Sequence, residues 1–274
     1  MPEGPEIRRS ADQLEQVLAG HVAQSLRFAF PRLKKYARQL VGQTIDVVEP
    51  RGKAMLIHFA NGMSIYSHNQ LYGEWFVFPG KPPATHLQER LLIQTDAGTA
   101  VLYSASEIAV LPTGALPQHS YIARLGVDLL GRNVTAAAVL KQVNAPRFAR
   151  RSLAALLLDQ GFLAGLGNYL RSEILFACRL HPDLRPTDLT PAQRRLLARQ
   201  ASLLTKRSYR TAGITNNLAL ARRLKAQGAA FGAYRHAVFE RADLPCYACG
   251  TRIVRVERGR ALFMCPHCQA KPAA

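Results

Sequence analysis

The sequence contains no apolar run long enough to cross a bilayer, and acidic and polar residues interrupt any signal-peptide pattern at its start. A membrane or secreted protein is therefore not expected, and we predict a cytoplasmic one. Cysteine is scarce, with five residues in 274. Because disulfides are rare in a reducing compartment, a disulfide framework is a poor explanation for these cysteines. Internal repeats and low-complexity tracts are also missing from the sequence.

Acidic residues are few in the second half of the chain. Residues 131–274 carry 24 Lys and Arg against 7 Asp and Glu, a net charge of 24 − 7 = +17, whereas residues 1–130 carry 12 against 11, a net charge of +1. Arginine dominates the excess, and its planar guanidinium suits phosphate recognition. A merely solvated face would not confine so much positive charge to one half, so the charge predicts a polyanionic partner, nucleic acid.

The apolar patterning predicts an α+β protein of more than one domain. A helix is expected from about Pro5, followed over residues 40–110 by strands with Asn61-Gly62 and Asp96-Ala97-Gly98 at hairpin turns. These strands are expected to form an antiparallel β-sandwich. From about residue 133 the pattern is helical, with helices expected over residues 135–143, 150–160, 168–180 and 190–209, the last with Thr190-Pro191 as its N-cap and first turn. Residues 211–235 are expected to be a linker or mobile loop with one short helix. The predicted domains are residues 1–130, 131–235 and 236–274.

Four of the five cysteines form two Cys-x-x-Cys pairs with fifteen residues between them, in "CYACGTRIVRVERGRALFMCPHC". Each pair supplies two thiolates from one tight turn, and the residues between can form a β-hairpin with "ERGR" at its turn. With all four positions of a tetrahedron filled by protein, one zinc ion would be structural. His267 is expected to be a bystander and Cys178 a buried helix residue. The predicted ligands are Cys246, Cys249, Cys265 and Cys268.

The glycine-rich stretch "GFLAGLGN" precedes a predicted helix that begins near Asn168. Free backbone amides at a positive helix end, together with the asparagine side chain, form a suitable seat for a phosphate. The alternative is an ordinary helix-turn-helix packing unit that uses glycine for close approach. Neighbouring arginines favour DNA: Arg147, Arg150, Arg151 and Arg171.

The chain starts "MPEGPE", which places Pro2 between the initiator and two carboxylates, Glu3 and Glu6. If Met1 is removed, as a small second residue normally permits, Pro2 becomes a free secondary amine. The alternative is purely structural, because proline and acidic residues both favour the first turn of a helix.

Five motifs together resemble the bacterial formamidopyrimidine-DNA glycosylase and endonuclease VIII family. They are, in chain order, "MPEGPE", "RGKAML", "SHNQLYG", "LDQGFLAGLGNYLRSEIL" and "GRALFMCPHCQ". The resemblance covers essentially the whole chain, and Gly4 and "QLYG" are closer to the endonuclease VIII branch. It implies an N-terminal catalytic domain, a helix-two-turn-helix domain and a zinc ribbon.

The resemblance implies that Pro2 is the nucleophile of a glycosylase with lyase activity. An α-amino group, with a reference pKa of about 7.7–8.0, is far more often neutral at pH 7 than a lysine at about 10.4. Glu3 would be the general acid/base. Glu6 would orient the site or only cap the helix. Lys53 would reach the phosphate near the lesion, although a solvated lysine at a strand start is an alternative.

The resemblance also implies DNA-contacting residues. Gln70, Leu71 and Tyr72 would form a wedge that fills the space left by a flipped nucleotide, unless Tyr72 packs into the core. Arg260, in the ribbon, would complete the site. Arg124 and Asn168 would hold backbone phosphates.

The sequence therefore predicts a bifunctional DNA glycosylase and AP lyase that removes oxidised pyrimidines from duplex DNA with β,δ-elimination. The expected partner is duplex DNA with oxidised bases or abasic sites, bound by a monomer in the bacterial cytoplasm, on the nucleoid. One alternative is the oxidised-purine branch of the same family. Another is a non-catalytic zinc-ribbon protein that binds nucleic acid.

Overall fold

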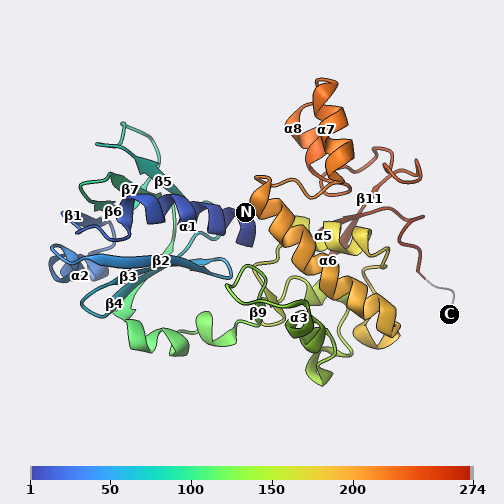
Figure 1. Ribbon diagram of the computed structural model, residues 1–274, viewed down its shortest axis with the longest axis horizontal. Coiled ribbons are helices and arrows are strands. Elements are labelled where there is room, and N and C mark those ends of the chain that lie inside the picture. Colours follow the sequence, from blue (N-terminus) through green and yellow to red (C-terminus); the bar gives the residue numbers. More distant parts are fainter. Residues whose placement is uncertain (1, 272–274) are drawn as a thin grey trace. The chain divides into compact units, whose positions relative to one another are not determined.

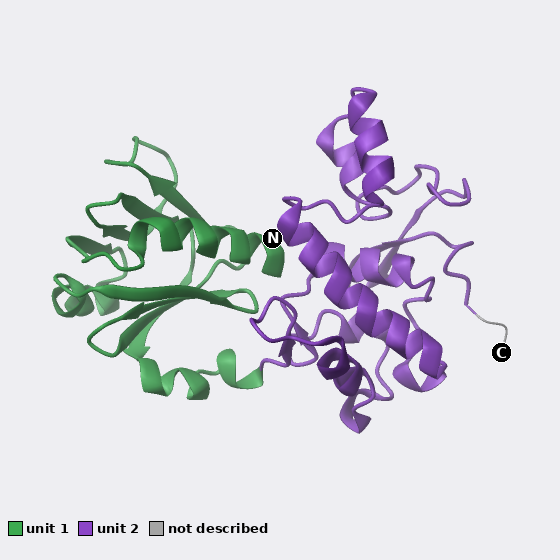
Figure 2. Cartoon of the chain, in the orientation of Figure 1, with its two compact units in different colours: residues 1–124 green, residues 125–274 purple. Residues whose placement is uncertain are grey.

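The computed structural model describes residues 2–271. The chain forms two compact units, residues 1–124 and 125–274 (Figure 2). The cysteine-rich segment belongs to the second unit, and the division into three domains stays a prediction. Among the described residues, no helix is long and apolar enough to span a membrane.

Unit 1 begins with the helix α1 (Gly4–Leu18), which has a simple basis in the sequence. Pro5 lies in its first turn, where a missing N–H has no consequence. Ile7, Leu14 and Leu18 recur on one face and are at most 1% exposed. Gly20, at φ 81°, allows the chain to turn away after the helix. The helix predicted from about Pro5 is thus confirmed.

Two four-stranded antiparallel sheets form most of unit 1 after α1 (Figure 1). The first has the order β2-β3-β4-β8, with β2 (Ile45–Arg51), β3 (Ala54–Phe59), β4 (Met63–His68) and β8 (Glu107–Pro112). The second has the order β1-β6-β7-β5, with β1 (Ser25–Phe28), β6 (Glu89–Gln94), β7 (Thr99–Tyr103) and β5 (Glu74–Phe78). Buried residues from both sheets and from α1 form one apolar core.

Both predicted hairpin turns are present. Asn61-Gly62 lies between β3 and β4, and Asp96-Ala97-Gly98 lies between β6 and β7. The sequence did not predict the helix α2 (Lys34–Leu40). Three short 3-10 helices complete the unit, at Pro31–Leu33, Thr113–Gln118 and Ile122–Arg124.

Unit 2 is mainly helical, as predicted. Its helices α3 (Ala136–Val143), α5 (Asn168–Ala177) and α6 (Pro191–Arg210) agree with the expected segments. The hydroxyl of Thr190 accepts a hydrogen bond from the backbone N–H of Gln193, which confirms the predicted N-cap of α6. The helix expected over 150–160 is shorter, because α4 (Leu153–Leu156) gives way to the glycine-rich turns. Two 3-10 helices also occur, at Pro146–Phe148 and Pro186–Asp188.

Side-chain amides close the two turns between α4 and α5. Gln160 donates to the carbonyls of Leu158 and Leu166 and accepts from the N–H of Gly165. These turns lie beside a short parallel pair, β9 (Val127–Asp128) and β10 (Leu163–Ala164). A Cβ on Gly126 would stand 2.4 Å from two carbonyl oxygens of this region, so only glycine fits there.

The segment 211–235 differs from the prediction, because it contains two helices, α7 (Leu218–Ala226) and α8 (Phe231–Arg235). The Asn217 side chain caps α7 by accepting from the N–H groups of Ala219 and Leu220. The predicted hairpin of β11 (Val254–Arg258) and β12 (Arg260–Met264) follows further along the chain and turns at Gly259 with φ 73°. Leu262 and Met264 of β12 share a core with the helices, so the ribbon is part of unit 2.

Candidate functional site

The N-terminus of α1 presents a buried carboxylate. Glu3 is 3% exposed, and its backbone N–H donates to the Glu6 carboxylate at 3.0 Å. Glu6 also accepts from the Arg9 guanidinium at 3.2 Å. Glu6 therefore fixes the backbone at Glu3 while it caps the helix. Pro2 precedes this cap and is half-buried, and Met1 lies outside the described residues.

Lys53 lies in the two-residue turn that joins β2 to β3. Gly52 occupies the preceding turn position with φ 61°, which glycine adopts readily. Lys53 is 8% exposed, and its backbone N–H donates to the Tyr121 hydroxyl at 2.9 Å. The alternative of a solvated lysine at a strand start is therefore wrong. The helix α1, which Glu3 caps, packs against β2 and β3, the two strands that the turn with Lys53 joins.

The loop between β4 and β5 exposes two large apolar side chains. Leu71 is 59% exposed and Tyr72 is 81% exposed, so Tyr72 does not pack into the core. The loop is tight, since the N–H of Gly73 donates to the carbonyl of Asn69 at 2.8 Å. A Cβ at Gly73 would lie 2.6 Å from that oxygen, which makes glycine necessary. We call Leu71 and Tyr72 the tip.

Polar groups gather at the base of this loop. Burial lowers the pKa of His68, as does the nearby Lys53 ammonium, while the Glu107 carboxylate raises it. His68 accepts the backbone N–H of Gln70 on Nδ1, so this nitrogen is unprotonated. His68 and Glu107 are paired across β4 and β8, and this pairing could not be predicted from local sequence patterns.

In unit 2, α5 carries Asn168 at its first turn. The Asn168 amide donates to the carbonyl of Ala261 at 2.7 Å, which ties the helix to β12. Arg171, one turn later, is fully buried and donates to the carbonyls of Arg258 and Arg260. The expectation that Arg171 supports DNA binding is therefore wrong, because its guanidinium is enclosed by protein.

The turn between β11 and β12 is held by an ion pair on one side and carries an exposed arginine on the other. Arg258 forms a two-fold ion pair with Asp183, which raises the pKa of the arginine and lowers that of the carboxylate. Arg260 lies just after the turn and is exposed. In unit 1, Arg124 is also exposed, and its Nε donates to the carbonyl of Ser120 at 2.7 Å.

The four sulfur atoms of Cys246, Cys249, Cys265 and Cys268 all lie within 4.8 Å of one another. The distance is 4.0 Å between Cys246 and Cys268 and 3.5 Å between Cys249 and Cys265. Ligands at about 2.3 Å in a tetrahedron around one metal ion would be about 3.8 Å apart. These residues, which we call the four-cysteine cluster, can thus hold a metal ion. His267 is exposed and is not among them.

A buried carboxylate in α5 was not predicted from the sequence. Glu173 is 2% exposed and accepts the backbone N–H groups of Ala237, Val238 and Phe239 at 2.8–2.9 Å. It also accepts the Thr215 hydroxyl at 2.8 Å. Glu173 therefore joins the chain before α7 to the chain after α8. The sequence shows that Glu173 lies close to the glycine-rich motif, but its hydrogen-bonding partners are more than forty residues away along the chain.

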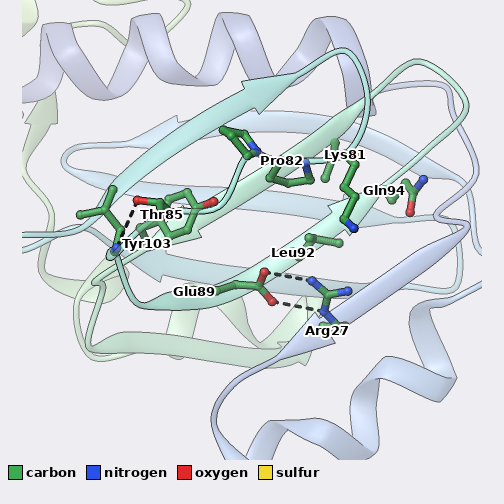
Figure 3. Close-up of a pocket in the computed structure, with 11 residues that line it drawn as sticks. Arg27, Lys81, Pro82, Thr85, Glu89, Leu92, Gln94 and Tyr103 are labelled. Atoms are coloured by element: carbon green, nitrogen blue, oxygen red, sulfur yellow. Dashed lines mark hydrogen bonds and ion pairs between the residues drawn. The ribbon is translucent and has the colours of Figure 1, made fainter.

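A pocket of about 480 Å³ opens on the second sheet of unit 1 (Figure 3). Leu92 and Tyr103 contribute to its lining, the loop around Lys81 and Pro82 covers it, and an ion pair of Arg27 with Glu89 at 3.0 Å borders it. None of the described residues predicted for the site lines this pocket.

Comparison with known proteins gives two family matches. The formamidopyrimidine-DNA glycosylase N-terminal domain matches residues 1–106, and the formamidopyrimidine-DNA glycosylase H2TH domain matches residues 125–218. Endonuclease 8 of an Escherichia coli strain is 45% identical over 271 residues, which are 98% of this chain and 100% of that protein. Endonuclease 8 of Shigella sonnei is 44% identical over the same shares.

Solved structures give the same fold at lower identity. The wild-type Lactococcus lactis Fpg (MutM) in complex with DNA containing N7-benzyl-Fapy-dG has a TM-score of 0.81 and is 20% identical, with 98% of this chain and 100% of that chain covered. The complex of the Lactococcus lactis Fpg with abasic-site DNA has a TM-score of 0.80 at 20% identity over the same shares. From these matches, and from the two units and the cysteine cluster described above, we conclude that the chain belongs to the formamidopyrimidine-DNA glycosylase and endonuclease VIII family.

Proposed function

We propose that this protein is a base-excision repair DNA glycosylase and AP lyase that removes oxidised pyrimidines from duplex DNA. The observation that carries the proposal is the 45% identity to an endonuclease 8 over the full length of both chains. The buried Glu3 directly after Pro2, at the start of α1, supplies the chemical groups that such an activity needs. The strongly basic second half supports a DNA partner.

The reaction starts at the amine of Pro2 once Met1 has been removed. The nitrogen attacks C1′ of the damaged nucleotide, the glycosidic bond breaks and the base leaves with a proton. Ring opening gives an iminium between Pro2 and the sugar, which acidifies the C2′ proton. Loss of that proton expels the 3′ phosphate by β-elimination, and a second elimination expels the 5′ phosphate. Hydrolysis of the iminium then restores the amine.

The proposed roles of the other residues in unit 1 follow from their surroundings. Glu3, enclosed by protein, would exchange protons with the sugar during ring opening. Glu6 would hold the backbone of Glu3 through the helix cap. Lys53 would bind the phosphate beside the lesion. Gln70 and the tip would form the wedge that fills the gap in the duplex.

Unit 2 and the end of unit 1 would bind the DNA backbone. Arg260 would complete the site from the ribbon, while Arg124 and Asn168 would hold phosphates. Asn168 also supports β12 through its bond to Ala261, so loss of its side chain would disturb the ribbon as well. A single structural zinc ion in the four-cysteine cluster would keep the hairpin rigid and take no part in the chemistry. Metal analysis of the purified protein checks the identity and number of the ions.

Relatives support the proposed partner. The Lactococcus lactis Fpg has been solved with DNA that contains a formamidopyrimidine lesion or an abasic site. We expect this chain to bind duplex DNA with oxidised bases or abasic sites as a monomer. Cytoplasmic location on the bacterial nucleoid remains part of the same proposal.

The decisive experiment is incubation with duplexes carrying thymine glycol or 8-oxoguanine in the presence of sodium borohydride, which reduces the iminium to a stable amine. We expect a covalent adduct with thymine glycol DNA, and peptide mapping should place it on Pro2. An adduct on Lys53, no adduct, or a mature protein that retains Met1 would contradict the mechanism. Preferential trapping on 8-oxoguanine would move the protein to the oxidised-purine branch.

A further inference from the structure

The Gln70 side chain is bound at both ends, unlike the two tip residues that follow it. Its Oε1 accepts from the Ser106 hydroxyl at 2.6 Å, and its Nε2 donates to the Glu107 carboxylate at 3.0 Å. Its backbone N–H donates to His68 Nδ1 at 3.0 Å. Three partners, one at the end of β4, one at the start of β8 and one just before β8, therefore hold one residue of the loop.

This residue also has an unusual backbone conformation. Gln70 has φ 52°, in the left-handed region that residues with a Cβ seldom occupy. Such a conformation persists where neighbouring contacts impose it. Because Gln70 immediately precedes the tip, its backbone angles set the direction in which Leu71 and Tyr72 leave the sheet.

Glu107 connects these contacts to the buried part of unit 1. Its other carboxylate oxygen accepts from the Tyr66 hydroxyl at 3.2 Å, and Tyr66 is fully buried. Glu107 is itself half-buried at the start of β8 and is paired with His68 across the sheet. The carboxylate therefore lies between a fixed core side chain and the loop.

We propose that Glu107 is a positioning residue for the wedge. It clamps the Gln70 amide, keeps the loop in its left-handed turn and thereby presents the tip in one orientation before DNA binds. Preorganisation of this kind lowers the ordering cost that a flexible loop would incur on insertion into the duplex. The inference rests on the proposed glycosylase function and assigns Gln70 to the base of the wedge.

The first measurement uses the free protein. Amide hydrogen exchange of the peptide spanning residues 69–73 reports the closed loop, in which the N–H groups of Gln70 and Gly73 are bonded. Glu107→Ala should accelerate this exchange, and Glu107→Gln should largely restore protection, since its amide oxygen can still accept from Gln70. Unchanged exchange in Glu107→Ala would overturn the proposal.

The second measurement is kcat/KM for release of an oxidised pyrimidine. Glu107→Ala should lose roughly five- to tenfold, the factor that corresponds to one net hydrogen bond. The same substitution in a background lacking the tip, Leu71→Ala with Tyr72→Ala, should have little further effect, because a positioning residue acts only through what it positions. Equal losses in both backgrounds would show a general structural role and refute the proposal.

A matched control removes a carboxylate close to the tip. Glu74 is exposed at the start of β5, so Glu74→Ala changes the local charge in the same way. It should alter neither loop exchange nor the tip-dependent rate. If the wild-type protein releases no oxidised base, the proposed function fails, yet faster exchange in Glu107→Ala would still support the clamp. If the wild type is active and Glu107→Ala matches it in rate, the clamp is refuted and the function stands.

Discussion

Replacement of Glu173 should destabilise unit 2 without affecting unit 1. The carboxylate accepts three backbone N–H groups and one hydroxyl in a site that is 2% exposed. In Glu173→Gln one oxygen becomes an NH₂ group. If that group faces Ala237, the bond from the Ala237 N–H is lost, while the Thr215 hydroxyl can reverse its role. A hydrogen bond to a charged group contributes about 1.5–3 kcal/mol, so we expect a loss of about 2 kcal/mol.

Glu173→Ala should cost more, because all four donors then lack their acceptor. Contributions within one cluster are not additive, and we expect about 4 kcal/mol rather than the full sum. For a unit of this size a loss of about 2 kcal/mol lowers Tm by roughly 4–8 °C. Thermal unfolding followed by circular dichroism at the helix band measures this change in unit 2.

The single tryptophan provides an internal reference. Trp75 lies in β5 of unit 1 and is 5% exposed, so its fluorescence reports the unfolding of that unit. Glu240→Gln, an exposed carboxylate in unit 2, is the matched substitution and should have almost no effect. The reasoning would be refuted by a Glu173→Gln loss below about 0.5 kcal/mol, the usual range of a surface change. An equal shift in the Trp75 transition would refute it too.

Four further outcomes are expected. Glu3→Gln should retain duplex binding and lose about 10²–10⁴ in the rate of base release; a wild-type rate would limit Glu3 to the helix cap. Arg260→Ala, with metal content verified, should lose more activity on an oxidised pyrimidine than on a preformed abasic site, and equal losses would assign Arg260 to the shared lyase steps. Affinity for undamaged duplex should fall with salt at a slope of about −0.9 per neutralised phosphate, whereas a flat response would exclude phosphate-dominated binding. Burial, reinforced by the charge of Arg235, lowers the pKa of His236 from 6.5 to about 3. On acidification the unfolded chain therefore takes up the His236 proton before the folded one does. Unit 2 should lose stability as the pH falls from about 6.5 toward 3. His236→Gln should weaken that dependence in pH-jump unfolding, and an unaltered pH profile would contradict the assignment.

Local chemistry was sufficient to predict many elements of the fold. Asn61-Gly62 specifies a tight turn through the conformations that its residues allow, and the strands on each side follow from runs of β-forming residues. The spacing of the cysteines predicted four thiolates at one metal site, and the β11–β12 hairpin between the two pairs brings them together. Thr190-Pro191 likewise begins α6 through a bond to a residue three positions away.

Tertiary contacts decided what several site residues can do. Arg171 was predicted to support DNA binding, but its guanidinium bonds to carbonyls nearly ninety residues further along the chain. One short helix was expected in residues 211–235 and two are present, α7 and α8, because a polar, glycine-containing segment gives only a weak helical pattern. Its ends are fixed by Glu173, which lies on another helix.

The sequence by itself determined which chemical groups this protein has: a proline at position 2, adjacent carboxylates, a basic second half and two cysteine pairs. These depend on residue identity and short spacing, which need no long-range contact. The tertiary structure decided which of those groups are enclosed and which are presented. Lys53 is buried beside Tyr121, which lies between two 3-10 helices far along the chain. Gln70 donates to Glu107 because β4 and β8, distant in sequence, pair within one sheet. Burial and orientation arise from such non-local pairing, whose partners a linear pattern of residues does not specify.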